Sequence, residues 1–216
     1  MWFKRNKSYS RSEILDAAGK ARAKGRRKRA IAEYQKLLKA DSGDYVVHGK
    51  IAPLLAEMRN YSESWSSFKA AGEGYLHKGF EDKAKSIYIQ ATRHLPYEID
   101  AWKAVVELYL SRRHEADALK TLNDGRHNFR HRTQRAEAIC LLRMAHDITP
   151  DRFDVTLDLA HLLAKTGKRV EAVRLLEGLA ARDQGHNLRR IRGSLLRISP
   201  SPSFAWHWLR AALSNA

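Results

Sequence analysis

Apolar residues recur at helical spacing along almost the whole of this 216-residue chain. The segment RAIAEYQKLLKAD places Ala30, Tyr34 and Leu37 on one face of a helix, and VTLDLAHLLAKTG does the same with Leu157 and Leu163. Runs of β-branched residues bounded by turns, which are typical of strands, are nearly absent. The pattern therefore predicts an all-α protein.

Helix-ending residues interrupt this pattern roughly every 15–18 residues. They predict about a dozen helices joined by short loops, and short loops make successive helices antiparallel neighbours. The interruptions fall at Gly25, residues 41–43, Asn60, Gly79, Pro96, residues 112–113, Pro150, Gly167 and Pro200. Ser10 and Glu13 fit a capping box, so the first long helix should begin directly after Ser10.

Two glycines stand among good helix formers in AAGEGYLHKGFEDKAKSIYIQATRHLP, residues 70–96. Glycine inside a helix costs about 1 kcal/mol relative to alanine, so a close helix contact should offset that cost at Gly72. Gly74 lies off the same face, and the sequence offers no reason for it. Large and small residues alternate in a fixed order at Phe68, Ala71, Gly72, Tyr75, Ala84, Tyr88, Ala91 and Pro96.

This order resembles the tetratricopeptide repeat, and its offsets recur in linked series over about residues 11–186. The series slip in phase twice, because His48 to Phe68 and Trp102 to Leu122 are each 20 residues apart. At each slip one helix, expected at 61–78 and at 114–129, should pack on both faces. The resemblance implies a right-handed α-solenoid of antiparallel helix pairs, in which each unit buries its face against its neighbours.

We expect three parts: a flexible basic segment at residues 1–10, the repeat array at residues 11–198, and a capping helix at residues 199–216. The first residues show no apolar run after their charges, so no secretory signal peptide is expected. They offer either a flexible start or a weak anchor on anionic lipid through Met1, Trp2 and Phe3. The last part offers either a cap or an exposed docking site through Phe204, Trp206, Trp208 and Leu209.

The chain is strongly basic, since 40 Lys and Arg residues oppose 24 Asp and Glu residues and leave a net charge of +16. Such an excess favours acidic partners, which are nucleic acid, anionic lipid or acidic protein surfaces. The interpretation as ordinary solvated helix faces stays open. The clustered cations predict a basic patch at Lys24, Arg26, Arg27, Lys28, Arg29, Arg189, Arg190 and Arg192.

No motif predicts catalysis, a cofactor or a metal. The segment GKARAKG, residues 19–25, has the wrong order for a phosphate loop. His127 and His131 are four residues apart, but RHNFRHR supplies no carboxylate or thiolate ligand for a metal. Cys140 is the only cysteine, which excludes an intrachain disulfide, and we expect it in the core of a helix at 133–147. We therefore expect a protein without enzyme activity.

Tetratricopeptide arrays as a family bind partner proteins or peptides in a concave groove, so the resemblance implies an adaptor or scaffold, here for an acidic partner. The clamp that some members use for chaperone C-terminal carboxylates is not visible, because Leu15 and Gly19 stand at its expected positions. The residues expected on the groove are Lys69, Glu73, Lys103, Glu107, His127, Arg130, His131, His161 and Lys165.

Two alternatives stay open beside groove binding. One is association with nucleic acid or an anionic membrane through the basic ends, and the other is assembly with further copies or with a larger complex. No run approaches the roughly 18 apolar residues that a transmembrane helix needs. We expect a cytoplasmic protein, either free or peripheral at a membrane.

Overall fold

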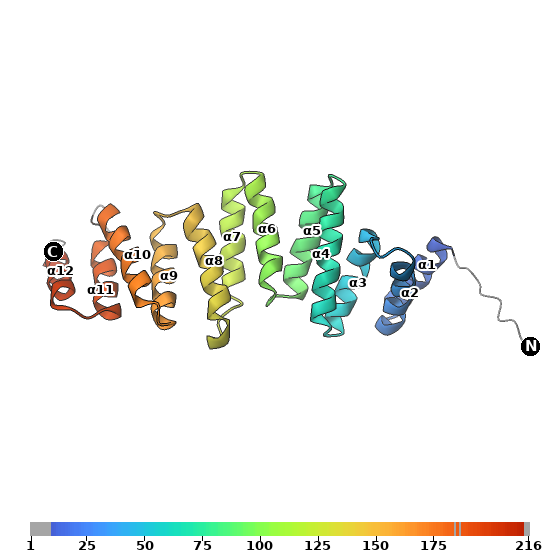
Figure 1. The fold of residues 1–216 in the computed structure, drawn as a ribbon, viewed down its shortest axis with the longest axis horizontal. Helices are drawn as coiled ribbons and strands as arrows, with labels where there is room; N and C mark the ends of the chain where they lie inside the picture. The colour runs from blue at the N-terminus through green and yellow to red at the C-terminus, as the bar shows by residue number, and fades with distance from the viewer. Residues whose placement is uncertain (1–9, 184, 186, 214–216) are drawn as a thin grey trace, which may run out of the picture. The chain divides into compact units, whose positions relative to one another are not determined.

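The computed structural model describes residues 10–183, 185 and 187–213, and these form twelve α-helices and one short 3₁₀ turn with no strand among them (Figure 1). The predicted all-α fold of about a dozen helices is confirmed. The first six helices are α1 (Arg11–Ala23), α2 (Arg27–Ala40), α3 (Tyr45–Glu57), α4 (Tyr61–His77), α5 (Glu81–His94) and α6 (Ile99–Ser111). The others are α7 (Glu115–Arg126), η1 (Arg132–Gln134), α8 (Arg135–Ile148), α9 (Phe153–Lys165), α10 (Arg169–Arg182), α11 (Leu188–Ile198) and α12 (Pro202–Leu213).

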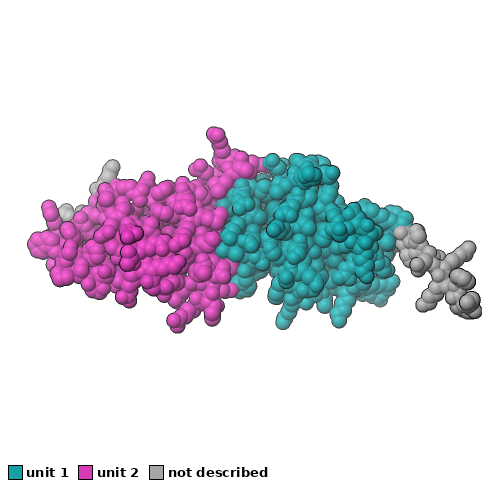
Figure 2. All heavy atoms as spheres, in the orientation of Figure 1, with its two compact units in different colours: residues 1–108 teal, residues 109–216 magenta. Residues whose placement is uncertain are grey.

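The chain divides into two compact units, residues 1–108 and residues 109–216, which Figure 2 colours teal and magenta. Each unit buries its own apolar side chains. Unit 1 has cores around Ile51 and around Phe68, and unit 2 has a core around Leu163 and Leu176. The expected division into a basic segment, an array and a cap stays a prediction, and residues 1–9 lie outside the described residues.

Two helices of unit 1 begin with side-chain caps. The predicted capping box is confirmed: the Ser10 hydroxyl accepts from the Glu13 N–H, and the Ser10 N–H donates to the Glu13 carboxylate. Asp44 caps α3 by accepting from the Val47 N–H, and Arg11 of α1 donates to the same carboxylate over 2.6 Å. Burial alone would raise the pKa of Asp44, but these hydrogen bonds hold it below its ordinary value.

Helix α4 packs closely against both of its neighbours in unit 1. A Cβ atom on Gly72 would lie 2.6 Å from Oη and 2.7 Å from Cε1 of Tyr88 on α5, so the predicted close contact is confirmed. Gly74 also has a structural reason, since its Cβ would lie 2.6 Å from Cγ of Tyr45 on α3. Tyr45 in turn packs edge-on against Tyr75. The two glycines thus admit one neighbour on each side, as the phase slip predicted for this helix.

The protonation state of Tyr88 makes the stability of unit 1 depend on pH in the alkaline range. Its burial, and secondarily the charges of Glu73 and Glu107, raise the pKa of Tyr88 from 10.0 to about 12. The neutral phenol therefore stabilises the fold fully below pH 10, and this contribution is lost as the pH rises toward 12. We expect the free energy of unfolding to fall less steeply above pH 10 in Tyr88→Phe than in the wild type. Denaturant titrations on either side of pH 10 measure this, and Tyr97→Phe, at a 66% exposed tyrosine, is the control.

The helices of unit 2 form two layers. Arg126 of α7 donates to Asp158 of α9 over 2.7 Å, so these two helices meet across α8. Arg143 of α8 pairs with Glu171 of α10, so these two meet across α9. His161 of α9 contacts Ser194 of α11, so α11 belongs to the same layer as α7 and α9. Helices α7, α9 and α11 therefore share one layer, and α8 and α10 share the other.

Unit 1 alternates in the same way. Arg11 of α1 reaches Asp44 at the start of α3, and Gly49 of α3 lies against Ile87 of α5, where an added Cβ would be 3.2 Å from Cδ1. Helices α1, α3 and α5 thus share one layer of this unit. Alternation of this kind is how repeat arrays stack their helix pairs.

One expectation about a single side chain needs correction, and one choice between alternatives stays open. Cys140 is half-buried rather than part of the core, because the neighbouring Ile139 and Leu141 take the inward positions of α8. At the C-terminal end Phe204 packs on the unit 2 core, whereas Trp206 is 67% exposed and covers no apolar face among the described residues. The role of α12 as a cap stays a prediction.

Candidate functional site

The groove residues expected in unit 1 lie on α4 and α6. Lys69 and Glu73 are exposed neighbours on α4, with Nζ and Oε1 3.8 Å apart. Lys103 forms an ion pair within its own helix, and Glu107 is exposed. The charges of Glu73 and Glu107 both contribute, after burial, to the raised pKa of Tyr88. This part of unit 1 therefore presents as many carboxylates as ammonium groups.

The groove residues expected in unit 2 fall into two places. His127, Arg130 and His131 lie where α7 ends, and Arg130 Nε donates to the His127 carbonyl over 2.8 Å. His161 and Lys165 lie on α9, one turn apart. A groove role for the whole predicted set stays a prediction.

The basic patch expected near the N-terminus is divided as well. Arg27 forms an ion pair with Glu57, and Lys28 borders a separate hollow beside α4. The remaining cations surround a hollow of about 230 Å³ between α1 and α2, together with Ala17 and Ala21. These cations are Lys24, Arg26 and Arg29, and Lys20, which was not part of the expected patch, lies beside them.

Two adjoining hollows of about 530 and 390 Å³ lie between α9 and α11, and both are bordered by His161 and Arg197. Leu157, Ser194 and Trp208 also border the first, and Ile198 borders the second. No carboxylate lines either hollow among the described residues. We call the basic side chains around them the α9–α11 basic face: His161, Lys165, Arg169, Arg189, Arg190 and Arg197.

The sequence of α11 explains why its arginines point outward. Ile191, Leu195 and Ile198 recur at helical spacing and are buried in the core of unit 2. Arg190, directly before Ile191, keeps its guanidinium carbon 4.9 Å from the centre of the Phe153 ring, a cation–π contact that holds it at the surface. Arg192 is turned away, since its Nη1 donates to the His207 carbonyl of α12 over 2.8 Å.

His161 is the half-buried centre of the basic face. Its Nε2 lies 3.1 Å from Ser194 Oγ, and that hydroxyl donates to the Arg190 carbonyl over 3.0 Å. Because the single hydroxyl proton is used there, His161 must donate from Nε2. Burial, followed by the charge of Arg197, lowers the pKa of His161, while Asp158 opposes the shift. The imidazole is therefore neutral near pH 7.

A titration of His161 tests this arrangement. We expect the imidazole signal to change below pH 6.5, because burial and Arg197 disfavour the charged form. The stability that the neutral ring contributes is fully present above pH 6.5 and is lost as the pH falls through its folded-state pKa. Proton NMR of the histidine rings measures the titration, and the spectrum of His161→Gln assigns the signal. A titration midpoint of His161 above pH 6.5 would contradict the burial of its imidazole ring.

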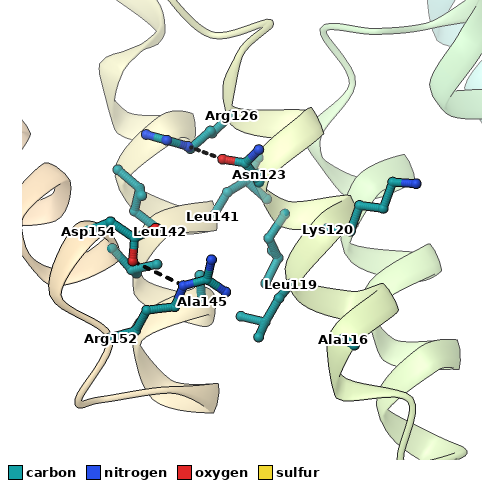
Figure 3. Close-up of a pocket in the computed structure, with 12 residues that line it drawn as sticks. Ala116, Leu119, Lys120, Asn123, Arg126, Leu141, Leu142, Ala145, Arg152 and Asp154 are labelled. Atoms are coloured by element: carbon teal, nitrogen blue, oxygen red, sulfur yellow. Dashed lines mark hydrogen bonds and ion pairs between the residues drawn. The ribbon is translucent and has the colours of Figure 1, made fainter.

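A further hollow of about 310 Å³ lies between α7 and α9, above α8 (Figure 3). Its lining includes the apolar side chains of Leu119, Leu141 and Leu142, and two of its arginines are paired within the lining. Arg126 Nε donates to Asn123 Oδ1, and Arg152 Nε donates to Asp154 Oδ1, each over 3.0 Å. This hollow therefore offers an apolar contact beside the basic face.

The described residues contain no group of three or more His, Cys, Asp or Glu side chains placed to hold a metal ion. Within the same part of the chain, no helix combines the length and the apolar character that crossing a membrane requires.

Comparison with known families identifies the segment that carries most of the basic face. The family model described as "Tetratricopeptide repeat" matches residues 130–195. These residues are similar to a tetratricopeptide repeat. The predicted resemblance is thereby confirmed, and the matched repeat segment contains α8, α9, α10 and most of α11.

Solved structures similar to this chain are also repeat proteins. MamA is 16% identical, with 93% of this chain and 95% of that chain covered and a TM-score of 0.34. A kinesin light chain from Podosopora anserina with nearly identical TPR-like repeats is 16% identical, with 94% and 93% covered and a TM-score of 0.42. YrrB, described as a TPR protein with an unusual peptide-binding site, is 16% identical, with 91% and 90% covered and a TM-score of 0.27. No curated protein matches the chain.

The basic face combines residues that sequence reasoning assigned to different sites. His161 and Lys165 were expected on a groove, and Arg189 and Arg190 in a separate patch, yet His161 shares one hollow with Lys165 and the adjoining hollow with Arg189 and Arg190. The repeat offset gives one signal that could have joined them, since His161 and Ser194 are 33 residues apart. Sequence reasoning missed the bordering arginines Arg169 and Arg197 and placed Trp208 only in a C-terminal cap or docking site.

Proposed function

We propose that this chain is a tetratricopeptide-repeat adaptor that binds an acidic segment of a partner protein along the α9–α11 basic face. The observation that carries the proposal is a pair of adjoining hollows with cationic side chains and no described carboxylate around them. Repeat arrays present extended surfaces of this kind to their partners.

The charge pairing around the two hollows differs from that elsewhere in unit 2, which supports this choice of surface. In the layer of α8 and α10, Arg143 pairs with Glu171, and Arg182 pairs with Asp151 in the loop between α8 and α9. On the basic face, no described carboxylate forms an ion pair with Arg189, Arg190 or Arg197. Unpaired charge of one sign steers and selects partners of the opposite sign.

The neighbouring hollow gives the proposed partner a second feature. Helix α9 borders the basic hollows through His161 and borders the apolar hollow through Val155. An extended segment that follows α9 could place acidic residues near Arg190 and an apolar residue over Leu119. The best partner is therefore acidic with an apolar anchor.

Charge reversal in unit 2 tests the proposal. The probe is a short fluorescein-labelled peptide of alternating glutamate and leucine, and binding is followed by fluorescence anisotropy. We expect Arg190→Glu with Arg197→Glu to weaken binding by more than about tenfold, because two unpaired cations become repulsive. The matched control, Arg26→Glu with Arg29→Glu, makes the same charge change in unit 1 and should have little effect.

The control variant, Arg26→Glu with Arg29→Glu, also tests a second candidate function. This function is association with anionic polymers or membranes through the hollow between α1 and α2. Its supporting observation is the four cations around that hollow. The probes are duplex DNA and phosphatidylserine vesicles at about 50 and 200 mM salt. Loss of binding in the unit 1 pair alone, with a lower salt dependence, would replace the adaptor by this second function.

A further inference from the structure

The hollow between α9 and α11 concentrates more positive charge than one carboxylate can pair with. Arg189, Arg190 and Arg197 border the larger hollow, and Lys165 and Arg169 lie across the shared edge. A carboxylate carries one charge, whereas a phosphate monoester carries about −1.5 to −2 at pH 7 and presents three acceptor oxygens. The number of donors therefore fits a phosphate better.

Arginine is also the suitable side chain. Its planar guanidinium binds phosphate oxygens through two parallel N–H donors, and it stays charged at every physiological pH. Arg190 is already oriented by its contact with Phe153, with the guanidinium carbon 4.9 Å from the ring centre. Less side-chain entropy is lost when an oriented group binds.

One wall of the same hollow is aromatic. The indole of Trp208 lies against the backbone of α11 at Gly193, where an added Cβ would be 3.3 Å from Nε1. No described residue accepts a hydrogen bond from this half-buried indole N–H. Together with Leu157, the indole offers an apolar surface and one free donor at the edge of the cationic cluster.

We propose that the α9–α11 basic face recognises a phosphorylated serine or threonine next to an apolar residue in its partner. The phosphate lies between Arg190 and Arg197, and the apolar neighbour packs on Trp208 and Leu157. This inference rests on the proposed function and adds the chemistry of the group that anchors the partner.

The experiment compares three labelled peptides of one sequence, Glu-Leu-X-Leu-Glu, in which X is serine, glutamate or phosphoserine. We expect phosphoserine to bind about tenfold more tightly than glutamate. Arg190→Gln with Arg197→Gln should remove this preference and leave a similar weak affinity for both peptides. The matched control removes two exposed unit 2 cations that border neither hollow, as Arg174→Gln with Arg210→Gln, and should keep the preference.

A second measurement locates the phosphate. Without a bound anion, burial, followed by the charges of Arg197 and Lys165, lowers the pKa of His161, and Asp158 opposes the shift. A bound dianion should raise the pKa of His161, and inorganic phosphate should compete with the phosphopeptide. Proton NMR of the ring with and without the phosphopeptide measures the shift.

The outcomes separate the two proposals. Equal affinity for the glutamate and phosphoserine peptides would overturn the phosphate preference and leave the adaptor. No affinity for either acidic peptide would overturn both. An RNA oligonucleotide that binds more tightly than the phosphopeptide, through Arg190 and Arg197, would assign the face to nucleic acid instead.

Discussion

Gly72→Ala is expected to destabilise unit 1, although alanine is the better helix former. The added methyl group would overlap with the ring of Tyr88, 2.6 Å from its oxygen, and both residues lie between packed helices. Overpacking of a close contact costs about 1–3 kcal/mol. That exceeds the gain of about 1 kcal/mol from replacing glycine in a helix. Gly72→Leu should destabilise further.

Urea titrations followed by circular dichroism measure the effect. The matched control is Gly19→Ala on α1, where no heavy atom lies within 4 Å of an added Cβ, and this variant should be more stable than the wild type. A double-mutant cycle with Tyr88→Ala should show strong coupling, because removing the ring makes room for the methyl group. Equal stabilisation by both alanine substitutions would show that α4 and α5 do not approach closely.

Leu176→Ala is expected to have the largest effect in unit 2. Leu176 of α10 is fully buried, and it packs in a cluster with Leu163 and Ile191 from the other layer. Truncation of a buried leucine leaves a cavity and costs about 2–5 kcal/mol. The helix propensity of alanine is too small a gain to offset that loss.

The control for Leu176→Ala is Leu209→Ala, which removes the same atoms from a side chain that is 47% exposed on α12. Thermal unfolding of both variants should show a large fall in melting temperature for the first and a small change for the second. Similar melting temperatures would mean that α10 does not pack into the core of unit 2.

The sequence predicted the parts of the fold that depend on local pattern. Apolar periodicity located the helices, and the capping box at Ser10 located the start of α1. The small residue at Gly72 predicted a close helix contact, because a missing side chain in a good helix needs a partner to offset its cost. These features need only neighbouring residues, which a single sequence contains.

Features that depend on a third helix were less predictable. The reason for Gly74 lies in Tyr45, which is 29 residues earlier on α3. Arg197 joins His161 only because α9 and α11 share a layer, and periodicity within one helix does not reveal that layer. Cys140 was misplaced for a similar reason: its two chain neighbours, Ile139 and Leu141, are both buried on α8, which the repeat pattern did not indicate.

The two glycines of α4 have a mechanical consequence. Each is a notch in the helix surface, one filled by the ring of Tyr88 and the other by the Cβ and ring of Tyr45. A ring seated in such a notch prevents the helix that carries it from sliding along the axis of α4. Here the two notches lie within three residues of each other, on two sides of α4. Helices α3, α4 and α5 must therefore move as one rigid block. Bending within unit 1, which would change the curvature offered to a partner, is left to the joints outside this block.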